Sequence, residues 1–373
     1  MGKYTRRLFS TKKIYRLKHT DRIFVQAMRE NAIFHYTRNA DYKRILDEAH
    51  FNPYDISTME DLYELPFIPT LYFKHHEMFS MPLRRIPIKA TSSGTSGLRS
   101  KIGMDLSSLW YGFKMVYRTF RYHKLWSLRP VTYIVFGYEP HKSNQAGIAK
   151  TANAFTLVAP ARKKVFAIKY TKDGYVVDLE RIKKALIEAD KKHRPVRTIG
   201  FPAYTYFLLK EMKAEGIKLN LHPKSFITIG GGWKQFYAER VDKEAFYSLV
   251  NEVLGVDESR CIEFFGAVEH PILYTDCRYH HFHIPVYSRV IIRDVDTLKP
   301  LPNGQVGLIN LMTPMVKALP ILSIMTDDLG ILHDEGCDCG ETSPWLEIIG
   351  RVGIKDITTC AAGAEELLGL KEE

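Results

Sequence analysis

Hydrophobic and polar residues change their spacing along the chain, and the first region they define is helical. Short apolar-periodic stretches, such as Ile23–Met28 and Tyr42–Ala49, predict helices within the first 75 residues. The segment Leu65–Phe73 contains Pro66 and Pro69, and the residue before a proline is restricted to extended backbone. We therefore expect a helical N-terminal segment that ends in an extended connector.

Strand-like and helix-like segments alternate through the middle of the chain. Runs rich in β-branched and aromatic residues predict strands at Val131–Tyr138, Val165–Tyr170, Val196–Phe201, Ser225–Ile229 and Cys261–Phe265. Helical spacing between them predicts helices at Leu179–Lys192, Tyr204–Glu215 and Glu244–Leu254. This alternation indicates an α/β fold, with mixed but mostly parallel sheets covered by helices.

From Tyr287 onward the pattern is typical of antiparallel strands. Val290–Asp294 and Val306–Leu311 flank Asn303-Gly304, a pair that forms tight hairpin turns. The pattern therefore predicts a smaller β-rich part after the α/β part. We expect one main domain over residues 1–350, with its helical segment at 1–75 and its β-rich part at 285–350, followed by a short tail at 351–373.

Composition and charge limit the classes of partner. The chain is 45% hydrophobic and 25% charged, which is typical of a globular protein. No run of about 18 apolar residues is present, so we expect no membrane-spanning helix. The 53 basic and 42 acidic residues give a net charge of +11, which favours anionic partners without choosing among them. No nucleic-acid-binding module is recognisable, and the oligomeric state does not follow from the sequence.

The cysteines point to a compartment and to a metal site. Five cysteines, an odd number without a secretory signal, indicate a reducing environment, and we expect a cytoplasmic protein. Cys277, Cys337 and Cys339 with His283 are a ligand set that suits structural zinc, whereas reduced cysteines packed as small hydrophobes are the alternative. His280 and His281 compete with His283 as the imidazole ligand.

A run of small residues introduces a second kind of chemistry. The run is followed by Lys101 and comprises Thr91, Ser92, Ser93, Gly94, Thr95, Ser96 and Gly97. Glycine lets backbone N–H groups converge on an anion, and hydroxyl groups add donors to phosphate oxygens. Flexible linkers have a similar composition, and the run lacks the GxxxxGK[ST] pattern. On its own it therefore fits either a phosphate-binding loop or a linker.

Further segments follow this run in a fixed order. They are Gly230-Gly231-Gly232, Phe264-Phe265-Gly266-Ala267-Val268-Glu269, Thr326-Asp327-Asp328-Leu329-Gly330 and Gly350-Arg351. Together with the run, they resemble the nucleotide-binding signatures of the adenylate-forming superfamily, which includes the acyl-CoA ligases. The resemblance implies the fold of the superfamily's N-terminal domain and a site for ATP and Mg²⁺.

The resemblance also implies a role for each segment. The small-residue run would cradle pyrophosphate, the glycine turn would lie beside the adenine, and Phe264 or Phe265 would pack on the base next to Gly266. Glu269 would approach Mg²⁺, for which a carboxylate is a suitable hard ligand. Asp328 would hold the ribose hydroxyls, as carboxylates do in other nucleotide folds. Arg351 would reach the nucleotide, and Lys101 is a further catalytic candidate. A turn aspartate and a surface glutamate are the alternatives for the two acids.

One branch of the superfamily fits best. Its counterparts here are Leu65-Pro66-Phe67-Ile68-Pro69-Thr70, Gly230-Gly231-Gly232-Trp233-Lys234 and Ile292-Arg293-Asp294. These segments resemble the acyl-protein synthetases of the bacterial bioluminescence fatty-acid reductase (LuxE), over nearly the whole chain. Phenylacetate–CoA ligases are the next relatives; they share the Cys-x-Cys-Gly segment, and some have cysteine and histidine at the proposed zinc positions.

The C-terminal tail separates these two branches. Only residues 352–373 follow Arg351, too few for a lid domain with its own core, so we expect the full lid to be lacking. In the resembled synthetases a cysteine near the C-terminus accepts the acyl group as a thioester, and Cys360 matches it. Thiolates attack activated carbonyl groups well, although an incidental tail thiol is the alternative. Gly353-Ile354 departs from the acidic hinge of the ligases, which leaves hinge motion open.

These observations lead to one functional hypothesis and two alternatives. We expect ATP-dependent activation of a carboxylic acid, a fatty acid by resemblance, to acyl-AMP, followed by transfer to Cys360 and delivery to an acyl reductase. Phe201, Tyr204 and His141 are candidates for the acid pocket, with core aromatics and a loop histidine as the alternatives. The competing functions are a ligase that uses CoA or a carrier protein, and a non-catalytic nucleotide-binding scaffold.

Overall fold

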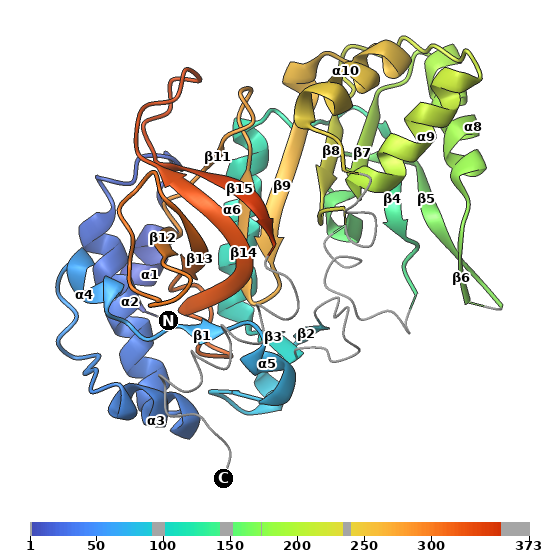
Figure 1. Cartoon of the computed structure of the whole chain (residues 1–373). Helices are drawn as coiled ribbons and strands as arrows, with labels where there is room; N and C mark the ends of the chain where they lie inside the picture. Colours follow the sequence, from blue (N-terminus) through green and yellow to red (C-terminus); the bar gives the residue numbers. More distant parts are fainter. Residues whose placement is uncertain (1, 92–100, 142–151, 173, 234–239, 352–373) are drawn as a thin grey trace. The chain divides into compact units, whose positions relative to one another are not determined.

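The computed structural model describes residues 2–91, 101–141, 152–172, 174–233 and 240–351 (Figure 1). The chain divides into two compact units. The first comprises Met1–Thr119, Gly266–Tyr274 and His281–Glu373, and the second comprises Phe120–Phe265 and Thr275–His280. In the described part of the chain, no helix has the length and hydrophobicity that are needed to cross a membrane.

The N-terminal part of the first unit is helical, as the apolar spacing predicts. Local capping explains two of the helix starts: the Asn39 side chain accepts from the Tyr42 N–H at 2.9 Å, and Thr58 forms a reciprocal capping box with Asp61. The helices are α1 (Lys3–Leu8), α2 (Asp21–Tyr36), α3 (Ala40–Glu48), α4 (Met59–Tyr63), α5 (Tyr72–His75), the 3-10 turn η1 (Leu83–Arg85) and α6 (Leu106–Tyr122).

The extended connector is confirmed in its first half. Strand β1 (Ile68–Pro69) pairs in parallel with β14 (Ser323–His333), and the Thr70 N–H donates to the Met325 carbonyl at 3.0 Å. The segment Leu65–Phe73 is not extended to its end, because α5 begins at Tyr72. The connector thus becomes an edge strand of the main sheet of the first unit.

That sheet has six strands in the order β11-β15-β14-β13-β12, with β1 paired to β14. Its other strands are antiparallel: β11 (Phe282–His283), β12 (Arg289–Arg293), β13 (Val306–Met312) and β15 (Trp345–Arg351). The predicted antiparallel pairing of Val290–Asp294 with Val306–Leu311 is confirmed as β12 and β13. The tight hairpin turn predicted at Asn303-Gly304 is wrong, because the chain already turns back between Asp294 and Lys299, where the Asp294 N–H donates to the Lys299 carbonyl at 2.9 Å. A second antiparallel pair in this unit joins β2 (Ile88–Thr91) to β3 (Lys101–Met104).

Helix α2 is tied to this sheet by buried polar groups. The Asn31 amide donates to the carbonyls of Pro314 and Val316 at 3.0 and 2.9 Å, and the Arg289 guanidinium pairs with Asp21 at 2.6 Å. Because buried polar groups are costly unless they are bonded, these contacts fix how the N-terminal helices pack on the strands.

The second unit is the predicted α/β part. Strand β4 (Val131–Tyr138) pairs in parallel with β5 and β7, β8 pairs in parallel with β9, and a parallel bridge joins Arg197 to Phe226. The remaining elements are β5 (Ala161–Thr171), β6 (Gly174–Val177), α8 (Leu179–Lys191), β7 (Val196–Gly200), α9 (Pro202–Ala214), β8 (Ile227–Gly230), α10 (Lys243–Leu254), η3 (Glu258–Arg260) and β9 (Cys261–Ala267). Strand β10 (His270–Thr275) follows β9 and belongs to the first unit except for its last residue.

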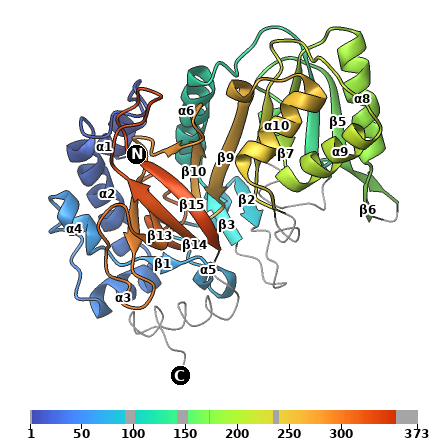
Figure 2. The same cartoon turned by 45° about the horizontal axis from the view of Figure 1, so that its top comes forward.

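The helices α8, α9 and α10 lie beside one another over the strands of this unit (Figure 2). Helix α8 shows why: Ile182, Ala185, Leu186 and Ala189 form one buried stripe at helical spacing. They pack in a core with strand residues such as Ile134. The five predicted strands and three predicted helices of this region are therefore confirmed, as is the mostly parallel pairing.

Candidate active site and metal centre

The Thr-Asp-Asp segment lies on β14 in the first unit, beside the end of β15. Asp328 is the register partner of Arg351, and Leu329 is the partner of Gly350. The Thr326 hydroxyl donates to the Ile309 carbonyl at 3.0 Å and accepts from the Asp328 N–H at 3.3 Å. These bonds hold the backbone at the point where the two nucleotide segments predicted from the sequence meet.

The adjacent Asp327 has a different environment. Its carboxylate accepts a hydrogen bond at 3.3 Å from the hydroxyl of Thr70, which follows β1. The sequence offers two neighbouring aspartates here, and the structure distinguishes them: Asp327 bonds to the connector, whereas Asp328 is the one opposite Arg351.

The small-residue run connects β2 to β3. Thr91 and Lys101 are register partners at the open end of that hairpin. Ser92, Ser93, Gly94, Thr95, Ser96 and Gly97 lie outside the described residues. The Lys101 ammonium forms an ion pair with Glu77, and both side chains are exposed. This contact places Lys101 at the surface next to the run.

The glycine turn follows the carboxyl end of β8 in the second unit. Gly230 is the register partner of Phe264 on β9, and a Cβ atom on Gly230 would lie 3.0 Å from the Phe264 carbonyl oxygen. Gly231 and Gly232 have φ values of 86° and 67°, which glycine adopts far more readily than other residues. In open α/β sheets, ligands bind beyond the carboxyl ends of the strands, which is where this turn lies.

The aromatic segment runs along β9 into a tight turn. The Phe264 ring stacks on Phe120 and contacts Phe155, with centroid separations of 5.9 and 5.8 Å. Neighbouring residues of a strand point to opposite faces, so Phe265 is directed away from that aromatic cluster. Glu269 lies in the two-residue turn between β9 and β10 and is only 5% exposed.

The three candidates for the acid pocket lie near the carboxyl ends of β4 and β7. Phe201 is buried, and the centroid of its ring lies 6.0 Å from that of the Tyr204 ring. Burial raises the pKa of Tyr204, with a smaller contribution from Tyr138. The His141 ring stacks on Tyr170 at 3.7 Å. Their role in substrate binding stays a prediction.

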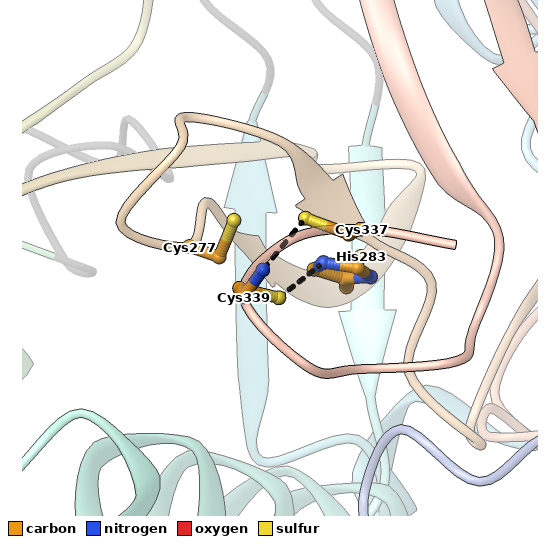
Figure 3. A group of neighbouring side chains, drawn as sticks. All are labelled: Cys277, His283, Cys337 and Cys339. Carbon is orange, nitrogen blue, oxygen red and sulfur yellow. Dashed lines mark hydrogen bonds between the residues drawn. The ribbon is translucent and has the colours of Figure 1, made fainter. Parts of the chain in front are cut away.

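The four predicted metal ligands come together (Figure 3). The Sγ atoms of Cys277, Cys337 and Cys339 and one ring nitrogen of His283 all lie within 4.8 Å of one another. His283 Nε2 is 3.2 Å from Cys339 Sγ. Cys277, His283 and Cys337 are buried, and Cys339 is partly buried. Cys277 and His283 come from one short stretch after β10, and the other two come from the loop between β14 and β15.

Neighbouring groups orient these four side chains. His283 Nδ1 lies 3.1 Å from both the carbonyl and the hydroxyl oxygen of Ser343. Backbone N–H groups donate to each sulfur: from Tyr279 to Cys277 at 3.4 Å, from Cys339 to Cys337 and from Glu341 to Cys339, both at 3.5 Å. A partner on the second ring nitrogen and donors to the sulfurs are the outer contacts that metal ligands need.

The structure separates the three competing histidines. His280 lies between the Asp276 and Glu258 carboxylates, at 2.7 and 2.9 Å. His281 stacks on Trp345 at 3.7 Å, while its Nδ1 lies 3.3 Å from Cys337 Sγ. Among the described residues, the group with metal-ligand spacing contains His283 and neither of the other two. Ser343 and Trp345 carry no sequence signal that would have marked them as supports of this cluster.

Of the two remaining cysteines, one is in the core and one lies outside the described residues. Cys261 begins β9 and is 3% exposed, and burial raises the pKa of its thiol. A buried thiol of this kind is a poor nucleophile. Cys360, the predicted acyl acceptor, lies outside the described residues.

Solved structures identify the fold of this chain. A 2-hydroxyisobutyryl-CoA ligase in complex with its acyl-AMP matches with a TM-score of 0.67 and 14% identity, covering 91% of this chain and 70% of that one. A long-chain-fatty-acid-CoA ligase from Archaeoglobus fulgidus matches with a TM-score of 0.50 and 12% identity, covering 74% of this chain and 53% of that one. The fold is that of the adenylate-forming ligases, as the sequence predicts.

The family follows from the sequence. The model of the family "Acyl-protein synthetase, LuxE" matches residues 10–368, and the chain belongs to this family. It is therefore an adenylate-forming ligase. A long-chain-fatty-acid–luciferin-component ligase of Aliivibrio fischeri is 27% identical over 341 residues, which are 90% of this chain and 85% of that protein. A phenylacetate-coenzyme A ligase of Thermus thermophilus is 25% identical over 323 residues, 85% of this chain and 66% of that protein.

Proposed function

We propose that this ligase uses ATP and Mg²⁺ to activate a carboxylic acid, a fatty acid as in the names of two relatives, to acyl-AMP and pyrophosphate. The observation that supports the proposal is the pairing of β14 with β15 in a chain of this family. It sets Asp328 opposite Arg351, and both lie in segments that resemble nucleotide-binding signatures. An acid and a base at adjoining positions suit the two parts of a nucleotide, because a carboxylate accepts ribose hydroxyls and a guanidinium binds phosphate.

The other segments would complete the ATP site. The run Thr91–Gly97 would donate to the phosphates, and the turn Gly230–Gly232 with Phe265 would hold the adenine. Phe264 is engaged in the aromatic cluster with Phe120, so Phe265 is the better candidate for contact with the base. Bound Mg²⁺ would neutralise charge on the phosphates. Glu269 would hold it, since a nearly buried carboxylate is stabilised by a cation.

The second half-reaction would transfer the acyl group to Cys360. The thiolate sulfur attacks the carbonyl carbon of acyl-AMP, a carbon–sulfur bond forms, and AMP leaves with the oxygen that joined it to the acyl group. In this proposal residues 1–350 form the activating domain and residues 351–373 form the tail that presents the thioester. An acyl reductase would then receive the acyl group from the tail.

A CoA ligase is the second candidate, and one relative favours it. The phenylacetate-coenzyme A ligase of Thermus thermophilus aligns with 85% of this chain. In that case CoA, rather than Cys360, would attack acyl-AMP. The two candidates share the first half-reaction and differ only in the thiol that receives the acyl group.

We also propose that Cys277, His283, Cys337 and Cys339 hold a structural zinc ion. Three thiolates and one imidazole are a common tetrahedral set, and the spacing and outer contacts of these residues fit it. Since all four positions are taken by protein ligands, the ion would cross-link the loop after β10 to the loop between β14 and β15. It would stabilise the fold and take no part in the reaction.

Exchange of labelled pyrophosphate into ATP tests activation, because it reports acyl-AMP formation without any acceptor. The purified chain is incubated with ATP, Mg²⁺, labelled pyrophosphate and one acid at a time, from short to long aliphatic chains and aromatic acids. We expect exchange only when an acid is present, with long-chain fatty acids most effective. Exchange with none of the acids would contradict the proposal. Formation of acyl-CoA on addition of CoA would favour the second candidate.

A further inference from the structure

A cationic cavity lies in the second unit, where the parallel strands begin. It has a volume of about 310 Å³. Five of its ten lining residues are basic and none is acidic; the basic ones are Lys124, Arg129, Arg197, Lys224 and Arg260. Five positive charges around one cavity repel one another unless an anion lies among them. The cavity therefore has the charge of an anion-binding site.

The position of the cavity separates it from the nucleotide segments of the same unit. Its wall includes Val131, the first residue of β4, and Phe226, which directly precedes β8. It also includes Arg260, which ends η3 and directly precedes β9. The glycine turn lies at the opposite, carboxyl end of β8. From Phe226 to Gly230 the strand rises by about 13 Å, at ~3.3 Å per residue. The cavity is thus not part of the site described above.

Arg197 gives the strongest argument that the cavity binds an anion. It lies in β7 and is 3% exposed, and its Nη1 donates to the Leu125 carbonyl. Its Nε is buried and has no hydrogen-bond partner among the described residues. The guanidinium lies 5.3 Å from the Phe226 ring centroid, with Arg260 5.1 Å from the same ring. A buried charge without a counter-charge is unfavourable, and burial lowers the pKa of Arg197.

The other basic residues leave the cavity open to a ligand. Lys124, Arg129 and Lys224 are exposed, and within the described ranges none of the five basic side chains forms an ion pair with a carboxylate. One carboxylate, Asp257, is affected by a basic residue of the cavity. Hydrogen bonds from Ser259 lower the pKa of Asp257 most, and the charge of Arg260 makes a smaller contribution.

The positive charges around the cavity also act on a neighbouring histidine, His222. The pKa of His222 is lowered, first by burial and then by repulsion from His193, Lys224 and Arg129. Lys224 and Arg129 line the cavity. The positive potential therefore extends around the cavity mouth and would attract an anion from solution.

We propose that this cavity binds a small phosphate-bearing molecule. Guanidinium groups match phosphate oxygens in two-point hydrogen bonds, and lysines add charge at the rim. A cavity of a few hundred Å³ accommodates a molecule of the size of a nucleoside monophosphate. The Trp126 ring, 38% exposed in the wall, offers a face on which a base can stack. The proposal is independent of the function of the nucleotide segments.

Binding is measured on the full chain with three probes: inorganic phosphate, pyrophosphate and uridine monophosphate. Trp126 lies in the wall, so a bound probe changes its fluorescence; Trp126→Phe removes that signal and leaves calorimetric binding in place. The pocket variant is Arg129→Glu/Lys224→Glu. Its matched control is Lys184→Glu/Lys210→Glu, two exposed lysines of the same unit that do not line the cavity. Both variants change the net charge equally.

We expect at least one probe to bind the native chain and the control, and the pocket variant to bind it at least roughly tenfold more weakly. The probe that binds best distinguishes a free phosphate from a nucleotide. If the charge-reversed chain does not fold, Arg129→Gln/Lys224→Gln is compared in its place. Equal affinity of pocket and control variants, or no Trp126 response to any of the probes, would overturn the proposal.

Discussion

Asp328 on β14 is the backbone register partner of Arg351 on β15. The sequence alone shows only that both positions resemble nucleotide-binding segments, whereas the strand pairing shows that they adjoin. The same pairing sets Gly350 opposite Leu329, so the end of β15 is held by the strand that carries the proposed ribose ligand. The two residues proposed to bind the nucleotide are therefore held by one ladder of backbone hydrogen bonds.

Asp328→Asn should raise the KM for ATP in pyrophosphate exchange by roughly 10- to 100-fold. The amide replaces a charged acceptor, and hydrogen bonds to charged groups contribute about 1.5–3 kcal/mol. The matched control is Asp327→Asn, because that carboxylate accepts from Thr70. We expect the control to lower the melting temperature slightly and to leave the KM nearly unchanged. Equal effects at the two positions would argue against a specific role for Asp328.

Gly230→Ala should impair nucleotide binding more than it impairs folding. The added methyl group would press on Phe264, 3.0 Å from its carbonyl oxygen, and displace β9 next to the proposed adenine site. Overpacking of this kind costs about 1–3 kcal/mol. Gly216→Ala is the control, since φ is +70° there and its Cβ would meet nothing within 4 Å. It should lower the melting temperature without changing the KM for ATP.

The elements predicted correctly from the sequence are those that local interactions determine. The stripe Ile182, Ala185, Leu186 and Ala189 has helical spacing whatever packs against it, and α8 follows. Strands β12 and β13 are recognisable from their own apolar residues, and they pair although residues 294–305 connect them. In both cases the information lies within a few neighbouring residues.

The features that could not be predicted depend on partners far away in the chain. The pairing of β1 with β14 joins Ile68 to Ile324, and no local signal identifies that partner. The ion pair of Lys101 with Glu77 likewise follows from the packing of α5 and β3 in the folded unit. The cysteines were recognisable by residue type. The predicted set already contains His283, but its competitors His280 and His281 could be set aside only in the fold, which orients the three side chains.

Zinc binding predicts a sharp difference among the cysteine variants. Native protein should contain about one zinc per chain, and Cys337→Ser or Cys339→Ser should remove it and lower the melting temperature, since zinc binding is coupled to folding. Cys261→Ser is the control and should retain the metal. His283→Asn should lose it while His281→Asn keeps it. Zinc content after dialysis is the measurement, and the reverse result for the two histidines would assign the ligand to His281.

The acyl acceptor is tested by Cys360→Ser. The variant should retain acid-dependent pyrophosphate exchange and lose the covalent acyl label, because activation precedes transfer. Cys261→Ser should keep both activities, since that thiol is buried and burial raises its pKa. The label is measured on denatured protein with and without hydroxylamine, which cleaves thioesters. A hydroxylamine-sensitive label that persists in Cys360→Ser would show that another group is the nucleophile.

Buried histidines predict that the fold loses stability in mild acid. Burial lowers the pKa of His35 and His270 from 6.5 to about 3, and that of His123 from 6.5 to about 4. The unfolded chain therefore binds these protons at a higher pH than the folded chain does. The stability is fully present above pH 6.5 and falls as the pH drops from 6.5 towards these lowered values.

Each such histidine should reduce the free energy of unfolding by about 1.4 kcal/mol per pH unit below 6.5. His35 is the best position for a test, because its ring lies 2.6 Å from the Ser80 hydroxyl and 3.1 Å from the Val316 carbonyl. A glutamine can still donate to that carbonyl. His35→Gln should therefore show a smaller pH dependence of its urea midpoint between pH 7 and about 5.5. The same change at exposed His19 should leave the native slope, and equal slopes for both variants would mean that His35 is protonated in the folded chain.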